Sequence, residues 1–260
     1  MCPWLQQDDM SSLATTGIVF VAVLGSAFLG MFLRKLLPPE HLSADTKDIV
    51  KLTTGLVGTI LALVLGLLIG SSKGYYDTQS AELIQSSAQI ILLDRVLAHY
   101  GPETQPARGL LRAIVANVFD RTWSRQSPGT SPADPALTTG ERLFAAIQQL
   151  TPRNDAQRSI QGQALNMVAG LGQTRWLMYE QSIARMPRAL LTMIVFWLCV
   201  LFLSYGLFAP PHATTIATLL LCAVSVAGAI LLIMEMYDPY RGLIRIPSAP
   251  MQAALEQLGK

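Results

Sequence analysis

Four long runs without a single charged residue constrain the fold of this chain more than any other feature. They cover residues 13–33, 52–72, 189–209 and 214–234. An α-helix rises ~1.5 Å per residue, so each run is long enough to cross the ~30 Å hydrocarbon core of a bilayer. The sequence therefore predicts an integral membrane protein with four transmembrane helices and the lipid bilayer as its surroundings.

The four runs form two pairs. A polar loop joins the first two, and the short turn Pro210-Pro211-His212 joins the last two, where prolines stop the preceding helix. Each pair is therefore expected to form a hairpin. The predicted organisation is an N-terminal transmembrane hairpin at 1–72, a soluble helical section at 73–187, a C-terminal transmembrane hairpin at 188–237 and a tail at 238–260.

A cleaved signal peptide is the alternative interpretation of the first run. Such a peptide begins with basic residues and has a shorter apolar core. The residues before this run include Asp8 and Asp9 but no Lys or Arg. We therefore expect the first run to be a retained span.

The composition agrees with a membrane protein and disfavours several other functions. Hydrophobic residues make up 51% of the chain, charged residues only 14%, and the mean hydropathy is +0.40. The net charge of +2 gives no reason to expect a nucleic-acid partner. The three histidines and three cysteines lack metal-ligand spacing, and no catalytic motif occurs. We expect no enzymatic activity, no metal and no cofactor.

The section between the hairpins has helical periodicity from its start. The second run continues without a helix breaker to about Tyr100, and Gly101-Pro102 should stop it. An amphipathic helix is predicted over residues 107–125, with Arg108 away from its apolar side.

Two further helices are expected before the third run. Thr138 and Glu141 have the spacing of a capping box, which predicts a short helix starting there. A long helix should run from Thr151-Pro152 to Met186, and Pro187 predicts a kink or break after it. No strand-like alternation is visible, so the predicted fold class is an all-α membrane protein.

The distribution of basic residues favours a cytoplasmic middle section. Two hairpins return the chain to the side it left, so both termini and the middle section should share one face. Cytoplasmic loops are enriched in Lys and Arg. Six basic residues lie near the span ends on that face, against four in the first loop: Lys73, Arg175, Arg185, Arg188, Arg241 and Arg245 against Arg34, Lys35, Lys47 and Lys51.

Small residues recur at three- or four-residue steps along the second run. They include Gly55, Ala62, Gly66 and Gly70. Because small residues let helices approach closely, one interpretation is helix packing. A second interpretation places this helix around an oligomer axis, with the small residues against neighbouring copies. Thr59, Leu63 and Leu67 would then face inward as a hydrophobic constriction that gates ions by dewetting.

Several segments, taken in order, resemble the bestrophin-like membrane proteins of bacteria, which are related to the bestrophin anion channels. The most specific is Asp238-Pro239-Tyr240-Arg241-Gly242 after the fourth run, which is similar to the family's acidic-Pro-aromatic-x-Gly segment. The others are Leu65-Gly66-Leu67, the aromatic Tyr76, and the basic-then-acidic loop from Arg34-Lys35 to Asp45–Asp48. The resemblance covers nearly the whole chain.

The resemblance implies a homopentamer in a bacterial inner membrane that passes small, chloride-like anions passively. It also implies a hydrophobic neck at Thr59, Leu63 and Leu67 and a helical cytoplasmic vestibule. The neck differs from that of bestrophins, because bestrophins place aromatic residues there. The tail lacks the acidic cluster that binds calcium in animal members.

Two alternatives stay open at this point. The protein could be a non-conducting membrane scaffold or sensor whose helical middle section binds a cytoplasmic partner. The tail segment could simply cap and end the fourth helix through Asp238-Pro239, with Arg241 and Arg245 as interfacial anchors.

Overall fold

A computed structural model describes residues 12–38, 44–123, 135–183, 188–210, 212–240 and 242–260. These residues are mainly helical, and no strand occurs among them. Within them, four helices are long and apolar enough to cross a membrane: Ser12–Leu36, Lys47–Tyr100, Ala189–Phe208 and Ala213–Tyr237. The predicted all-α class with four candidate spans is confirmed.

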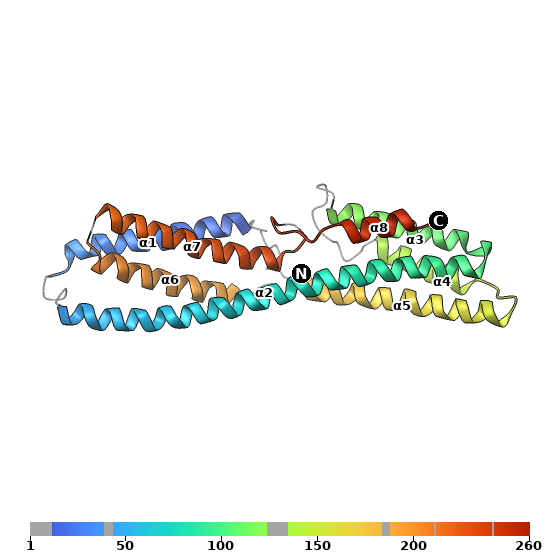
Figure 1. Cartoon of the computed structure of the whole chain (residues 1–260), viewed down its shortest axis with the longest axis horizontal. Helices are drawn as coiled ribbons and strands as arrows, with labels where there is room; N and C mark the ends of the chain where they lie inside the picture. The colour runs from blue at the N-terminus through green and yellow to red at the C-terminus, as the bar shows by residue number, and fades with distance from the viewer. Residues whose placement is uncertain (1–11, 39–43, 124–134, 184–187, 211, 241) are drawn as a thin grey trace, which may run out of the picture. The chain divides into compact units, whose positions relative to one another are not determined.

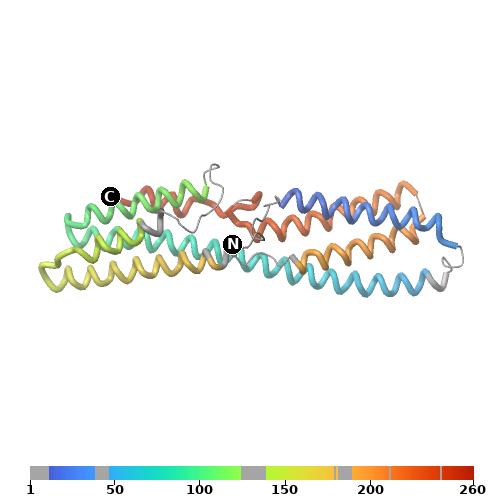
Figure 2. The backbone as a smooth tube through the Cα atoms, turned by 180° about the vertical axis from the view of Figure 1, so that it is seen from behind, coloured from blue at the N-terminus to red at the C-terminus, as the bar shows by residue number. Residues whose placement is uncertain are grey.

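The helices fall into two compact units (Figures 1 and 2). Unit 1 contains α1, α6, α7 and the part of α2 up to Tyr76, and unit 2 contains α2 from Asp77 onward with α3, α4, α5 and α8. The bounds are α1 Ser12–Leu36, α2 Ala44–Tyr100, η3 Pro102–Thr104, α3 Gln105–Trp123, α4 Pro135–Gln148, α5 Asp155–Ile183, α6 Arg188–Phe208, α7 Ala213–Tyr237 and α8 Ala249–Gln257.

Unit 1 is held by one apolar core to which all four of its helices contribute. Its buried residues recur at helical spacing, as Val19, Val23 and Ala27 do on α1 and Leu61 and Leu68 do on α2. Because the buried side chains lie on one face of each helix, the other faces point away from the core.

Glycines set the closest approach in unit 1, between α1 and α6. A Cβ atom on Gly206 would overlap the backbone carbonyl of Ala27, and one on Gly30 would overlap that of Leu203. The two backbones touch because neither glycine has a side chain. Arg34, in the last turn of α1, also donates to the Ala209 carbonyl beyond the end of α6, at 2.5 Å.

Gly206→Ala is expected to destabilise unit 1 by about 1–3 kcal/mol, because one methyl group would force α1 and α6 apart. Gly228→Ala on α7 is the matched control, since no atom lies within 4 Å of its Cβ position. An unobstructed Gly→Ala change inside a helix is stabilising by up to ~1 kcal/mol. Thermal unfolding in detergent should therefore move in opposite directions for the two variants. Equal midpoints would contradict the close α1–α6 contact.

The second helix extends as far as predicted, because α2 runs unbroken to Tyr100, but it begins earlier than the apolar run, at Ala44. Gly101 then has φ of 138°, a backbone conformation that residues with a Cβ rarely adopt. The Thr104 hydroxyl donates to the carbonyls of Leu97 at 2.7 Å and Gly101 at 2.8 Å, which fixes the reversal into α3. The Gly101-Pro102 stop is confirmed.

Two predicted helix starts were wrong. α4 begins at Pro135, so Thr138 lies inside the helix and is not its cap. α5 begins at Asp155 instead of Thr151-Pro152, because Asn154 accepts from the Gln157 backbone N–H at 2.8 Å and so caps the helix. The long helix ends at Ile183, and the predicted break at Pro187 lies outside the described residues.

Unit 2 packs the later part of α2 with α3, α4, α5 and α8. Its interior contains Leu93 and Leu97 of α2, Leu111 of α3 and Ile147 of α4, all nearly inaccessible to solvent. The short α8 adds the buried residues Met251 and Ala254, and its C-cap residue Leu258 is buried as well. The C-terminal segment is therefore part of the core of unit 2.

Candidate functional site

An uncovered apolar face on α2 is the main candidate site. Leu63 is 65% exposed and Leu67 is 67% exposed, and Thr59 on the same side is also exposed. Only 11% of the most apolar window of α2 is buried within the chain, against 22–28% for the other three spans. The proposed neck residues therefore share one helix face that their own chain leaves open.

The Thr59 hydroxyl is engaged with its own helix. It donates to the Gly55 carbonyl at 3.0 Å. This bond uses the hydroxyl proton, so the side chain offers an acceptor and a methyl group to whatever faces it. The face remains predominantly apolar even at its one threonine.

In the described part of the chain, the small residues of α2 do not pack against another helix. No atom lies within 4 Å of a Cβ built on Gly55, Gly66 or Gly70, and Ala62 is exposed. Packing of these residues thus depends on something outside the chain. A role in contacts between copies stays a prediction.

The turn after α7 is organised around a buried carboxylate. Glu235, in the last turn of α7, is 2% exposed. It accepts from the Ser12 hydroxyl, from the Leu243 backbone N–H and, at 3.4 Å, from the Ile244 backbone N–H. A Cβ on Gly242 would overlap this carboxylate, so a larger residue there would require the Glu235 side chain to move. Glu235 was not among the site residues predicted from the sequence.

The other residues of the tail segment have separate structural roles. Asp238 is the C-cap of α7, which ends at Tyr237. In unit 2, the Pro239 carbonyl accepts from the Ile246 N–H at 2.9 Å, and Tyr240 meets the edge of Trp123 at 6.3 Å between ring centroids. The Tyr240 hydroxyl also donates to Gln79 Oε1 at 3.4 Å. The segment therefore ends α7 at Asp238, and its residues Pro239 and Tyr240 contact other residues of unit 2.

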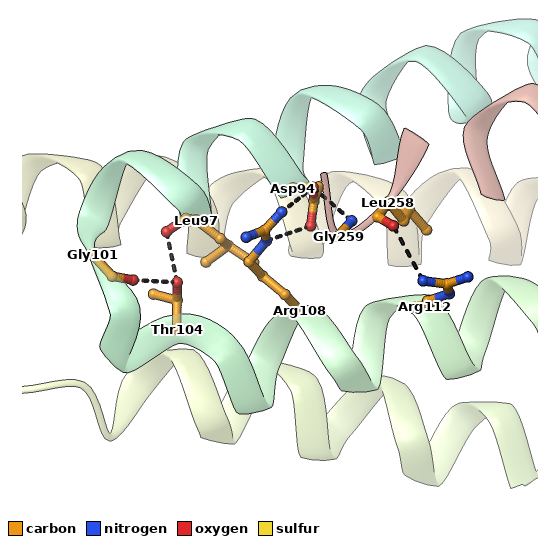
Figure 3. Close-up of polar contacts among 8 residues, drawn as sticks. All are labelled: Asp94, Leu97, Gly101, Thr104, Arg108, Arg112, Leu258 and Gly259. Atoms are coloured by element: carbon orange, nitrogen blue, oxygen red, sulfur yellow. Dashed lines mark hydrogen bonds and ion pairs between the residues drawn. The ribbon is translucent and has the colours of Figure 1, made fainter. Parts of the chain in front are cut away.

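A buried ion pair in unit 2 was not expected from the sequence (Figure 3). Arg108 donates to both carboxylate oxygens of Asp94, at 2.7 and 2.8 Å, and the Gly259 backbone N–H donates to the same carboxylate at 3.3 Å. Arg112 donates to the Leu258 carbonyl at 3.5 Å. This cluster joins α2, α3 and the C-terminal segment. The expectation that Arg108 lies away from the interior was wrong, because its charge is paired there.

The surroundings of Asp94 keep it ionised. Burial raises the pKa of this carboxyl. The Arg108 hydrogen bonds, the Gly259 N–H and the charges of Arg108 and Arg95 outweigh burial and hold its pKa below the ordinary value of an aspartate. The pKa of Arg108 is raised, chiefly by its hydrogen bonds to Asp94. The pair is therefore fully charged at neutral pH and acts as a structural element.

Within the residues that the structure describes, no group of three His, Cys, Asp or Glu side chains could hold a metal ion. The candidate site is the apolar face of α2 in unit 1, and the Asp94–Arg108 pair stabilises the helices of unit 2. An apolar face of this kind can constrict the path of a permeating ion or contact a partner.

The sequence profile of the bestrophin-like domain matches residues 21–251 of this chain. The chain belongs to the bestrophin-like family. The predicted resemblance is confirmed. The protein is therefore a channel-like membrane protein.

Solved structures of bestrophin homologues share the fold. A bacterial bestrophin homologue from Klebsiella pneumoniae aligns with a TM-score of 0.65 at 14% identity, covering 93% of this chain and 96% of the homologue. A point mutant of a bestrophin homologue from the same organism aligns with a TM-score of 0.62 at 17% identity, covering 96% and 97%. No curated protein sequence matches this chain significantly. The bestrophin-like fold thus extends over almost the whole chain at very low identity.

Proposed function

We propose that this bestrophin-like protein is a homo-oligomeric channel that passes small anions down their gradient. The copies would be arranged so that Thr59, Leu63 and Leu67 of each form a shared hydrophobic neck. The observation that carries the proposal is the exposure of Leu63 and Leu67 on a span that its own chain barely covers. Family membership supports the same class of function.

The proposal of anions rests on the family resemblance, because an alkyl neck does not select the sign of the ion. Alkyl side chains offer no ligands to replace the water around a permeating ion, so such a neck acts by dewetting. We further propose five copies, a bacterial inner membrane and cytoplasmic termini, on the family resemblance and the distribution of basic residues.

The test is current through purified wild-type protein in planar bilayers under a potassium chloride gradient. We expect the current to reverse near the equilibrium potential of chloride. Reversal near that of potassium would contradict anion passage. An intact oligomer without current would favour the alternative, a membrane scaffold whose helical section binds a cytoplasmic partner.

A further inference from the structure

The turn after α7 presents two large apolar side chains outward. Leu243 is 71% exposed and Ile244 is 38% exposed, and both belong to unit 1. Their backbone N–H groups donate to one oxygen of the buried Glu235 carboxylate, which holds the turn against the last turn of α7. The Ser12 hydroxyl donates to the other oxygen. Leu243 is therefore fixed at the level of Glu235 while its side chain stays uncovered.

Glu235 lies on the side of α7 that points away from the core of unit 1. The residues that precede it on this side are Leu221, Val224, Gly228 and Leu232. Steps of three or four residues keep them on one face of the helix, and all four are exposed. Glu235 continues that face but is only 2% exposed. The turn thus presents apolar side chains where the face would otherwise end in a carboxylate.

The level of Glu235 matches the boundary between lipid and water. The uncharged run of the fourth span, residues 214–234, ends directly before it. Two residues further on, Tyr237 stacks on Tyr75 of α2, with the ring centroids 5.7 Å apart. Tyrosine is enriched at membrane interfaces, where its ring meets lipid and its hydroxyl meets water. With α7 across the bilayer, Leu243 and Ile244 lie at this interface.

We propose that the Leu243-Ile244 turn inserts into the bilayer interface and contacts the upper part of the phospholipid acyl chains. The turn continues a face of α7 on which three of the four exposed residues are large and apolar. Contacts between membrane helices favour small residues instead, as between Gly30 and Gly206 of this chain. Lipid therefore fits this face better than a second copy does. The turn also keeps the Glu235 carboxylate away from lipid, where charged groups are costly.

Fluorescence quenching of a label at Leu243 tests the proposal. Cys2, Cys199 and Cys222 are replaced by Ala, and Leu243→Cys is labelled with bimane. The protein is placed in phosphatidylcholine vesicles with one of two quenchers. The first is phosphatidylcholine with a doxyl group near the top of one acyl chain, and the second is iodide on both sides of the membrane. The label should leave the turn intact, because Leu243 contacts Glu235 through its backbone and not its side chain.

Two reference positions calibrate the quenching. Leu221→Cys within α7 reports lipid, and Asp155→Cys in unit 2, whose native side chain is 96% exposed, reports water. We expect the doxyl lipid to quench the label at Leu243 ~5 times more strongly than the label at Asp155. Doxyl quenching no stronger than at Asp155 would overturn the proposal. Strong iodide quenching would then place the turn in water, and weak iodide quenching would place it against a second copy.

Glu235→Ala in the labelled chain tests whether the carboxylate positions the turn. Without this acceptor the Leu243 N–H loses its partner, so doxyl quenching should fall to about half and iodide quenching should rise. Asp48→Ala is the control, since Asp48 is an exposed carboxylate of unit 1. Unchanged quenching in Glu235→Ala would overturn the positioning role of Glu235.

The proposal rests on the spans and not on conduction. Both quenching measurements are made without any current, so a chain that carries no current leaves the lipid contact of Leu243 standing. Equally, a conducting oligomer whose Leu243 label is not quenched by lipid removes only the interfacial turn.

Discussion

Asp94→Asn is expected to destabilise unit 2 by about 3–5 kcal/mol, because it leaves the Arg108 guanidinium buried without its opposite charge. The side chain of Asp94 is 2% exposed and that of Arg108 is 10% exposed, so water screens the pair little. The amide also replaces one acceptor by a donor that faces the guanidinium. Equilibrium unfolding in detergent should show the loss, with faster hydrogen exchange in α3 and α8.

Asp155→Asn provides a matched control on an exposed pair. Asp155 and Arg158 are 2.8 Å apart, but their side chains are 96% and 69% exposed. Exposed pairs of this kind contribute little, so no measurable change is expected. Replacing both buried partners, as in Asp94→Leu with Arg108→Met, should restore much of the stability. Unchanged unfolding of Asp94→Asn alone would show that the pair is not a structural element.

The spans and the length of α2 could be predicted because their causes are local. A run without charge that is long enough to cross a membrane predicts a span in that same run. The Gly-Pro pair after Tyr100 likewise ends the helix that directly precedes it. The order of helices followed from the same signals. The predicted start of α5 was wrong because several nearby residues could cap a helix. In the structure the Asn154 side chain accepts from the Gln157 backbone N–H, and this bond sets the start of α5.

Contacts between helices could not be predicted in the same way. Small residues occur on α1, α2 and α6, yet in this chain the close contact is made by Gly30 and Gly206 and not by Gly66. Composition alone does not tell which glycines face a neighbour. The same limit applies to Arg108, whose partner Asp94 lies fourteen residues earlier across the turn.

The spacing of Thr59, Leu63 and Leu67 could be read from the sequence, because steps of four residues keep side chains on one side of a helix. The structure leaves that side of α2 exposed. Their role as a neck is a property of an assembly of copies, and no single chain contains it. It therefore stays a prediction that function must test.

Leu63→Ala and Leu67→Ala are each expected to raise conductance about tenfold. Every copy would lose three carbons from its contribution to the constriction, which widens and becomes easier to wet. A tenfold change corresponds to lowering the barrier by ~1.4 kcal/mol. The size of the oligomer should not change, because these side chains would face the axis and not a neighbouring copy.

The most direct test of the account compares Leu63→Ala with wild-type protein and with Leu221→Ala in planar bilayers. Leu221 on α7 is 68% exposed, close to the 65% of Leu63, but lies on a helix outside the proposed neck. We expect a larger single-channel current for Leu63→Ala and an unchanged current for Leu221→Ala, at the same oligomeric mass. Equal currents for all three proteins would contradict the α2 neck.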